Sequence, residues 1–312
     1  MLPEAGAPRP SPSSPRLPHH PGLRVEWRTL PRAHGKSYAI VWLGSEPVNS
    51  MTLELWSALR DTLAALEGDA KTSGVVFASE LRKPVFTAGN DIGELYAKKT
   101  NAARYAQFWR AQSVFLTHLL RSPLATACAI RGACPAGGCA VALCCDFRAQ
   151  TDFGTFGLNE VALGIPVPKF WGKLFVSRAT NAVEAENALM RGTLLAPSEA
   201  KALGLVDEIV PEAALTLATE RAMERMLRTP DDARAATKAN LRGDFSREWE
   251  AFIETEATNG WEMLASPEIE AALGEVVRRL SSKGGGRRDG SPPGETSARA
   301  RERAPAAARA KL

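Results

Sequence analysis

The segment from Ile130 to Phe147 reads IRGACPAGGCAVALCCDF and joins two apolar runs through a turn of small residues. The run before the turn, Leu124 to Ile130, is typical of a buried strand. The run after it, Ala140 to Cys145, is typical of a buried helix. This organising turn leaves backbone N–H groups uncovered.

The turn could bind a ligand or simply connect the two elements. Pro135 suits the first position of the new helix, where its missing N–H costs nothing. The two glycines Gly137 and Gly138 let a ligand approach the main chain closely. The free N–H groups at the start of a helix can hold an anion, or a carbonyl that is becoming one. From these residues alone, a tight connection in which glycine serves only packing is equally compatible.

Composition indicates an ordinary globular protein. The chain has 312 residues, of which 45% are apolar and 24% charged. No apolar run reaches the roughly 18 to 20 residues that span a bilayer, so no membrane span is predicted. The net charge of +4 comes from the ends, since residues 283–312 carry +5 and residues 1–24 carry +2, which leaves −3 for the middle. The sequence therefore predicts no basic face for nucleic acid.

All the cysteines lie close to the organising turn. Their spacing is not that of a metal site, and no histidine lies nearby. We therefore predict buried, reduced thiols that pack as small hydrophobic groups, no metal, and a reducing compartment. The five are Cys128, Cys134, Cys139, Cys144 and Cys145.

Four segments are expected along the chain. Residues 1–24 hold seven prolines and are predicted to be disordered or a leader. Residues 25–210 should form an α/β core, because a strand, a helix and a strand follow one another from Tyr38 to Phe77. Residues 211–282 should be helical, and 283–312 a disordered tail. Strands are predicted at 38–43, 75–77, 124–130 and 205–209, and helices at 52–66, 101–121, 140–145, 171–176, 182–190, 197–203, 213–226, 231–241, 249–264 and 267–280.

Two further segments carry candidate functional groups. In VFTAGNDIGEL, residues 85–95, the spacing of Asp91 and Glu94 fits a capping box, which places Asn90 just ahead of a helix. An ordinary capped helix is the alternative. In FGTFGLNEVAL, residues 153–163, Glu160 has apolar neighbours. Glu160 is either a surface carboxylate or a desolvated base with a raised pKa.

These features favour proton abstraction beside a carbonyl. All four histidines, at positions 19, 20, 34 and 118, lie outside the motif-bearing turns, so a Ser/His/Asp set has no base. No phosphate-binding or dinucleotide fingerprint lies at a suitable turn. Two turns with free N–H groups could instead hold an enolate oxygen while a carboxylate moves the proton.

The sequence here resembles a known family. FTAGNDI, GACPAGGCAVALCCDFR and FGLNEVALGI, in this order, resemble the enoyl-CoA hydratase/isomerase (crotonase) superfamily, with the strongest likeness to mitochondrial-type Δ3,Δ2-enoyl-CoA isomerases. The resemblance covers roughly Tyr38 to Ser282. It implies an α/β spiral of ββα units and a C-terminal helical region that mediates a homotrimer or a dimer of trimers.

The resemblance also implies an acyl-CoA substrate, with coenzyme A as part of the substrate and no separate cofactor. The N–H groups of Asn90 and Gly137 would hold the thioester oxygen, and Glu160 would be the catalytic carboxylate. The residues that match the family's substrate-binding positions are Ala88, Gly89, Gly138 and Leu158.

Three departures from the family pattern narrow the activity. Hydratases carry a second glutamate where this chain has Ala140, and dienoyl-CoA isomerases carry an aspartate where it has Pro168. At Asn90 relatives often have a small or aliphatic residue, and the change is expected to affect pocket shape more than mechanism. We therefore predict transfer of the double bond of 3-enoyl-CoA to trans-2-enoyl-CoA in unsaturated fatty acid β-oxidation. The alternatives are a hydratase, another acyl-CoA conversion, or a non-catalytic acyl-CoA-binding protein.

The two ends of the chain suggest different compartments. The last residues, Ala310, Lys311 and Leu312, resemble the SKL peroxisomal address and predict binding to the peroxisomal import receptor. The basic N-terminus and the family resemblance make the mitochondrial matrix the alternative.

Overall fold

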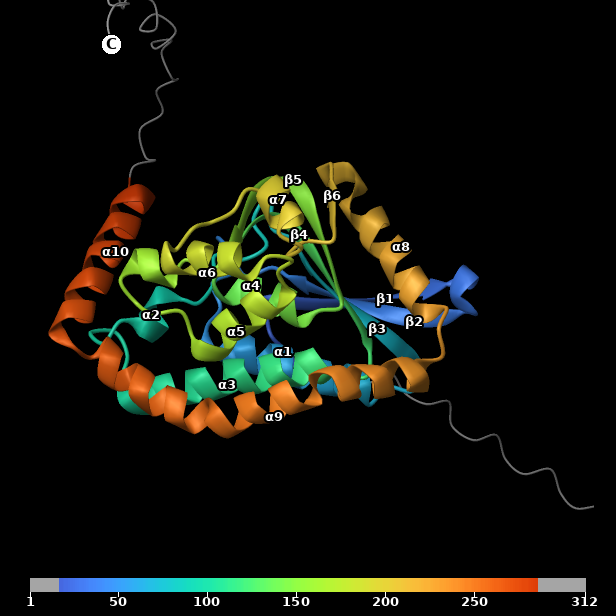
Figure 1. Ribbon diagram of the computed structural model, residues 1–312, viewed down its shortest axis with the longest axis horizontal. Helices are drawn as coiled ribbons and strands as arrows, with labels where there is room; N and C mark the ends of the chain where they lie inside the picture. Colours follow the sequence, from blue (N-terminus) through green and yellow to red (C-terminus); the bar gives the residue numbers. More distant parts are fainter. Residues whose placement is uncertain (1–16, 286–312) are drawn as a thin grey trace, which may run out of the picture.

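The fold is a six-stranded mixed sheet with helices on both faces. The computed structural model describes residues 17–285 (Figure 1). The strands follow one another across the sheet in chain order, with only the first pair antiparallel. They are β1 (Leu23–Leu30), β2 (Lys36–Leu43), β3 (Thr72–Ser79), β4 (Ala125–Pro135), β5 (Phe147–Gly157) and β6 (Glu208–Val210).

The helices begin and end largely where the apolar spacing predicts. Thr52 caps the first helix by accepting a hydrogen bond from the N–H of Leu55 (3.3 Å). The buried side chains of this helix recur on one face. The helices are α1 (Leu53–Glu67), α2 (Ile92–Leu95), α3 (Ala102–Arg121), α4 (Gly137–Cys144), α5 (Lys169–Arg178), α6 (Ala182–Met190), α7 (Pro197–Ala202), α8 (Leu215–Leu227), α9 (Asp231–Leu264) and α10 (Pro267–Gly285), with 3-10 turns η1 (Pro31–Ala33), η2 (Glu160–Leu163) and η3 (Glu212–Ala214).

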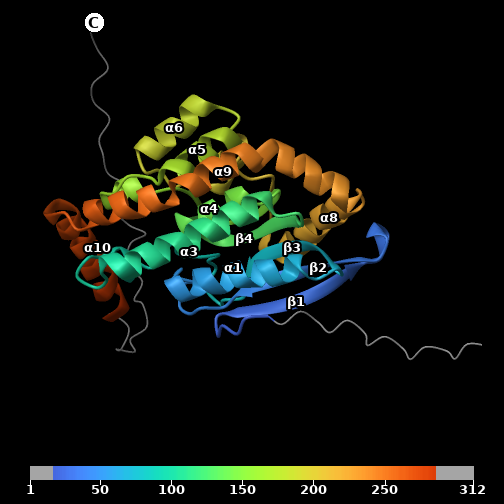
Figure 2. The same ribbon diagram turned by 90° about the horizontal axis from the view of Figure 1, so that it is seen from below.

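The helices form distinct layers around the sheet. Helix α8 covers one face over a smaller hydrophobic core, and α1, α3 and α4 cover the other over the main core. Helix α9 lies along the outer side of α3, and α10 continues from its end (Figures 1 and 2). The α/β architecture is therefore as predicted. Assembly into trimers stays a prediction.

The structure corrects several predicted boundaries. Strand β1 begins at Leu23, within the segment assigned to a leader, and α10 extends to Gly285, within the segment assigned to a tail. Strand β5 was not predicted as a strand. The helices predicted at 231–241 and 249–264 are one helix, α9, because the intervening turn is buried against α3, where Ser246 Oγ donates to the carbonyl of Thr117 (3.1 Å). Residues 310–312 lie outside the described residues, so the localisation stays a prediction.

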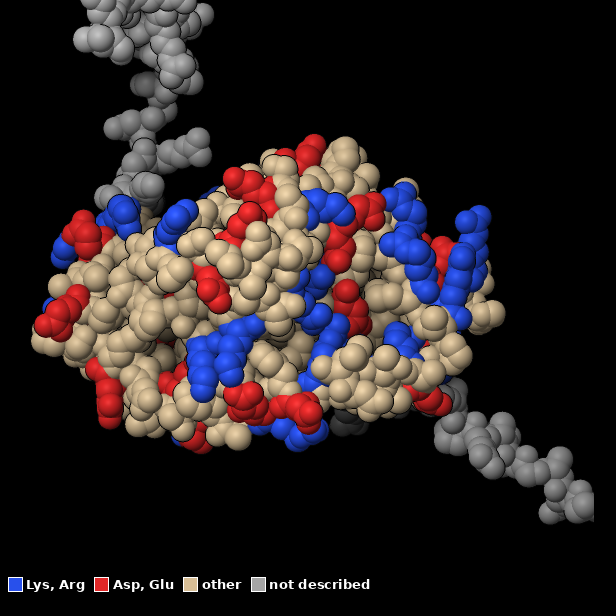
Figure 3. All heavy atoms as spheres, in the orientation of Figure 1, with Lys and Arg blue, Asp and Glu red and all other residues tan. Residues whose placement is uncertain are grey.

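The surface and the thiols agree with an ordinary globular domain. All five cysteines are buried and free of disulfides, as predicted, and burial raises the pKa of each thiol. On the face in Figure 3, basic side chains lie among acidic ones. Within residues 17–285 no helix is long and apolar enough to cross a membrane, and no cluster of His, Cys, Asp or Glu is placed to hold a metal ion.

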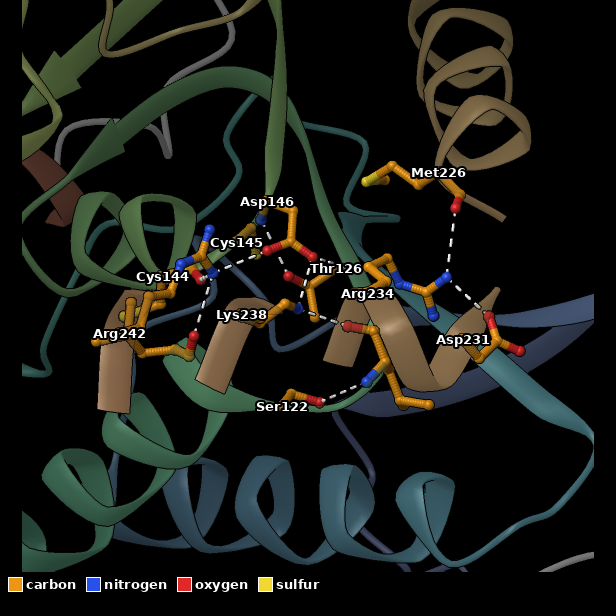
Figure 4. A network of polar contacts seen from close by, with 12 residues as sticks. Ser122, Thr126, Cys144, Cys145, Asp146, Met226, Asp231, Arg234, Lys238 and Arg242 are labelled. Carbon is orange, nitrogen blue, oxygen red and sulfur yellow. Dashed lines mark hydrogen bonds and ion pairs between the residues drawn. The ribbon is translucent and has the colours of Figure 1, made fainter. Parts of the chain in front are cut away.

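A buried ionic network ties α9 to the end of α4 (Figure 4). Asp146 accepts hydrogen bonds from two side chains of α9, Lys238 Nζ (2.6 Å) and Arg242 Nη1 (2.8 Å). It also accepts one from the N–H of Thr126 in β4 (2.9 Å). Lys238 Nζ also donates to the carbonyl of Leu124 (2.6 Å). Burial would raise the pKa of Asp146, but the two cations outweigh it and hold the pKa below its ordinary value. The network fixes α9 against the core.

Replacing Asp146 with asparagine should lower the free energy of unfolding by about 3 kcal/mol, because the change leaves the buried Lys238 and the partly buried Arg242 without their counter-charge. Urea unfolding measures the loss. Asp244→Asn is the control, since Asp244 pairs with Arg247 at an exposed site, where ion pairs contribute little. Equal effects of the two substitutions would contradict a structural role for the network.

Candidate active site

The organising turn is built differently from the prediction. Strand β4 continues through Pro135, which pairs with Gly157, so Pro135 ends the strand and does not begin the helix. Ala136 then turns the chain with φ 50° and ψ −122°, an unusual conformation for alanine, and its N–H donates to the carbonyl of Gly157 (2.9 Å). Helix α4 begins at Gly137. In the described part of the chain the N–H of Gly137 has no acceptor.

The second predicted turn presents one further N–H. The amide of Gly89 donates to Thr87 Oγ1 (2.9 Å), and that of Asp91 donates to the carbonyl of Met51 (3.0 Å). Between them, the N–H of Asn90 has no acceptor among residues 17–285. Helix α2 starts after Asp91 as predicted, but Glu94 does not complete a capping box, because it accepts instead from the N–H of Leu53 (3.1 Å) and pairs with Arg104.

The two turns lie against each other. A β-carbon built on Gly89 would lie 3.5 Å from the nitrogen of Gly137 and 2.8 Å from Cβ of Ala136. A β-carbon on Gly137 would lie 3.0 Å from Oδ1 of Asn90. Glycine is needed at Gly89, where a side chain would push the turns apart, and a side chain at Gly137 would crowd Asn90. The fold thus brings together the two N–H groups that the sequence singled out.

Glu160 is a buried carboxylate at the start of η2. Its exposed fraction is 5%, and neither carboxylate oxygen has a hydrogen-bond partner in the described residues. Burial raises its pKa from 4.5 to about 7. Glu160 is therefore a desolvated base that can gain and lose a proton near neutral pH, and a surface carboxylate is excluded.

The raised pKa has a consequence for stability. The folded protein binds the Glu160 proton more tightly than the unfolded chain does, so the stability from this proton is full below about pH 4.5 and is lost as pH rises to about 7. Glu160→Gln should reduce the stability difference between pH 5 and pH 8 by about 2 to 3 kcal/mol. Denaturant unfolding at both pH values tests this. The exposed Glu186→Gln is the control, and an unchanged pH dependence in Glu160→Gln would contradict the assignment.

A cavity of about 920 Å³ connects the carboxylate with the second turn. Glu160, Asn90 and Ala88 line one end. Helix α10 packs against η2. A β-carbon on Gly164, the residue after η2, would lie 3.2 Å from Cβ of Ala272 in α10. The other lining residues are mainly apolar, and many of them belong to helices α3, α5, α9 and α10. They include Tyr105, Trp109, Trp171, Phe252, Met263, Leu264, Val276 and Leu280.

Comparison with known proteins assigns this geometry to a family. Residues 38–279 match the family described as enoyl-CoA hydratase/isomerase. The chain belongs to the enoyl-CoA hydratase/isomerase family. It is 36% identical over 249 residues to mouse mitochondrial enoyl-CoA delta isomerase 1, covering 79% of this chain and 85% of the relative. The predicted crotonase superfamily is thereby confirmed.

Solved structures of the family share the fold. Human mitochondrial Δ3-Δ2-enoyl-CoA isomerase superposes with a TM-score of 0.78 and 33% identity, over 85% of this chain and all of the other. An enoyl-CoA hydratase from Bacillus halodurans superposes with a TM-score of 0.71 over 80% of this chain and 99% of the other. At 22% identity, the hydratase supports the fold alone.

The remaining predicted site residues have different surroundings. Gly89 forms the contact between the turns. Gly138 and Leu158 are buried and are not among the residues that line the cavity. A β-carbon on Gly138 would lie 2.3 Å from Cγ2 of Thr87, so this glycine allows α4 to pack on the second turn. Direct contact of these residues with substrate stays a prediction.

The positions that separate the family's reactions lie as the sequence suggests. Ala140 is fully buried in α4, which carries no carboxylate. Pro168 lines the cavity and precedes α5. Neither position supplies a second ionisable group.

Sequence reasoning missed a second carboxylate in the cavity. Glu256 of α9 lines the same cavity as Glu160, accepts a hydrogen bond from the N–H of Lys169 (2.9 Å), and has its pKa raised by burial. In the sequence it belongs to the polar part of an amphipathic helix, and no local signal separates it from the exposed glutamates nearby. Only the packing of α9 over α5 reveals its place.

Proposed function

We propose that the chain is an enoyl-CoA isomerase that converts 3-enoyl-CoA to trans-2-enoyl-CoA. The observation that carries this proposal is Glu160, a buried base with two unpartnered oxygens in a cavity that also reaches the N–H turn of Asn90. The likeness to isomerases over most of the chain supports it.

The reaction needs one base and one anion site. Ionised Glu160 removes a proton from C2, the electrons of that C–H bond move toward the thioester carbonyl, and a dienolate forms. The N–H groups of Asn90 and Gly137 donate to its oxygen, which carries the negative charge. Glu160 then returns the proton to C4, and the double bond lies between C2 and C3. The same carboxylate acts as base and acid, so a second one is not required.

The pH dependence of turnover tests this role of Glu160. Because the base must be ionised in the free enzyme, kcat/KM for isomerisation of 3-enoyl-CoA should rise with pH and reach half its maximum near pH 7. A coupled spectrophotometric assay between pH 5 and pH 9 measures the profile. A profile that is flat, or that falls over this range, would exclude Glu160 as the general base.

Hydration of 2-enoyl-CoA is the second candidate, because Glu256 provides another carboxylate in the cavity. Adding water across the double bond normally uses two carboxylates, one to activate water and one to protonate carbon. Glu256, however, already accepts the N–H of Lys169 at the start of α5. We therefore place hydration second. Loss of a hydratase activity in Glu256→Gln with retention of isomerisation would assign it to Glu256.

A further inference from the structure

The side chain of Asn90 belongs to a hydrogen-bonded chain of three residues. Its Oδ1 accepts from Nε1 of Trp56 (3.1 Å), and its Nδ2 donates to Oε1 of Gln112 (2.8 Å). Trp56 belongs to α1 and Gln112 to α3, and both are fully buried. The chain therefore ties the turn that carries the Asn90 N–H to two helices of the main core.

The chemistry of the three groups fixes the direction of this chain. An indole N–H can only donate, so the oxygen of the Asn90 amide must face Trp56. Its NH₂ group then faces Gln112, which must present its oxygen. The side chain of Asn90 thus has one orientation only, and both of its neighbours hold it there.

The same groups also contact the turn that presents the other N–H. A β-carbon built on Gly137 would lie 3.0 Å from Oδ1 of Asn90 and 3.2 Å from Cζ2 of Trp56. The Asn90 side chain and the Trp56 ring therefore form the surface on which Gly137 rests. A shift of the network would change the position of both N–H donors.

We propose that Trp56, Asn90 and Gln112 are a positioning network that holds the Asn90 and Gly137 N–H groups for the enolate oxygen. The proposal rests on the proposed function, and it replaces the expectation that the Asn90 side chain mainly shapes the pocket. The network carries a cost, since Nε2 of Gln112 is buried without a hydrogen-bond partner in the described residues. The role of Gln112 in holding Asn90 explains why this buried, unpaired amide group is retained. Small displacements of oriented groups reduce rates strongly.

Two variants break the network at its ends. Trp56→Phe removes the donor to Asn90, and Gln112→Met removes the acceptor. Each should lower kcat for isomerisation by about tenfold and leave KM within about twofold, since an interaction with the developing charge is weakened. The double variant should lose less than the product of the two single losses, because both act through one network.

Ligand binding separates positioning from general stability. A 3-oxoacyl-CoA has an acidic C2–H and can form an enolate that shares negative charge between the 3-oxo and thioester oxygens, whereas a saturated acyl-CoA remains neutral there. Both variants should bind the 3-oxoacyl-CoA about tenfold more weakly and the saturated ligand within about twofold of wild type. Trp249→Phe controls for lost volume in a buried tryptophan, and Trp27→Phe controls for a lost indole hydrogen bond, to Thr72 at 3.2 Å. Neither control should change the ratio of the two affinities.

The outcomes are distinct. An unchanged ratio of affinities in Trp56→Phe and Gln112→Met, or the same change in the controls, would overturn the positioning role. If the wild type fails to isomerise 3-enoyl-CoA while the ratio still depends on Trp56 and Gln112, the proposed function is wrong and the network stands. Calorimetric titration of the folded proteins gives both affinities without turnover.

Discussion

Glu160→Gln is expected to lower kcat for isomerisation by about 10³-fold or more, with KM within a few-fold of wild type. Glutamine has nearly the same shape but cannot take a proton. Of the other carboxylates that line the cavity, Asp91 accepts the N–H of Gly93 and Glu256 accepts the N–H of Lys169, so neither is expected to replace the base. Steady-state assays with 3-enoyl-CoA near pH 8 measure the effect.

The cavity itself offers a matched control for this substitution. Glu256→Gln makes the same chemical change to another carboxylate that lines the cavity. If isomerisation needs one carboxylate, Glu256→Gln should retain kcat within about tenfold, well above the loss expected for a general base. Comparable losses in the two variants would contradict a single-base mechanism. Near-wild-type isomerisation by Glu160→Gln would remove Glu160 from the mechanism.

Gly89→Ala should reduce kcat by about 10² to 10³-fold, because it disturbs the oxyanion site. Gly89 has φ 87°, and its β-carbon would lie 2.8 Å from Cβ of Ala136 and 3.2 Å from the carbonyl oxygen of Pro135. These neighbours belong to the other turn, so relief of the contact separates the Asn90 and Gly137 N–H groups. Single-turnover rates with saturating 3-enoyl-CoA report the effect on chemistry directly.

Gly35→Ala separates this effect from backbone strain. Gly35 also has positive φ, 72°, but no atom lies within 4 Å of its β-carbon position. The substitution should cost about 1 kcal/mol of stability and leave kcat unchanged. If folded Gly89→Ala protein kept kcat within about threefold of wild type, the two turns would not form the oxyanion site.

The candidate site could be predicted because its main parts are local. Free N–H groups at a turn depend on small residues a few positions apart, so the two turns could be identified from short motifs, and the family resemblance then implied Asn90 and Gly137 as the donors. Glu160 could be identified because its chain neighbours are apolar, and burial then raises its pKa as expected. The contact between the two turns depends on the fold, and only the family resemblance predicted it.

The errors arose where long-range packing decides the structure. Pro135 fits the start of a helix locally, but pairing with Gly157 keeps it in a strand. Separate helices were predicted at 231–241 and 249–264, but the residues between them continue the single helix α9, with Gly243 buried. Trp56, Gln112 and Glu256 follow ordinary helical patterns, and only contacts between helices give them a place at the site.

The identity of the product formed from 3-enoyl-CoA tests the central claim most directly. The claim is that this chain shifts a double bond with one carboxylate and adds no water, since Ala140 and Pro168 supply no second group and Glu256 already accepts the N–H of Lys169. Liquid chromatography coupled to mass spectrometry distinguishes the reactions, because it separates 2-enoyl-CoA from unreacted 3-enoyl-CoA of the same mass. We predict a 2-enoyl-CoA from purified wild-type protein, formed at least about 10³-fold more slowly with Glu160→Gln. A 3-hydroxyacyl-CoA, heavier by one water, as the main product of the protein acting alone would contradict the account.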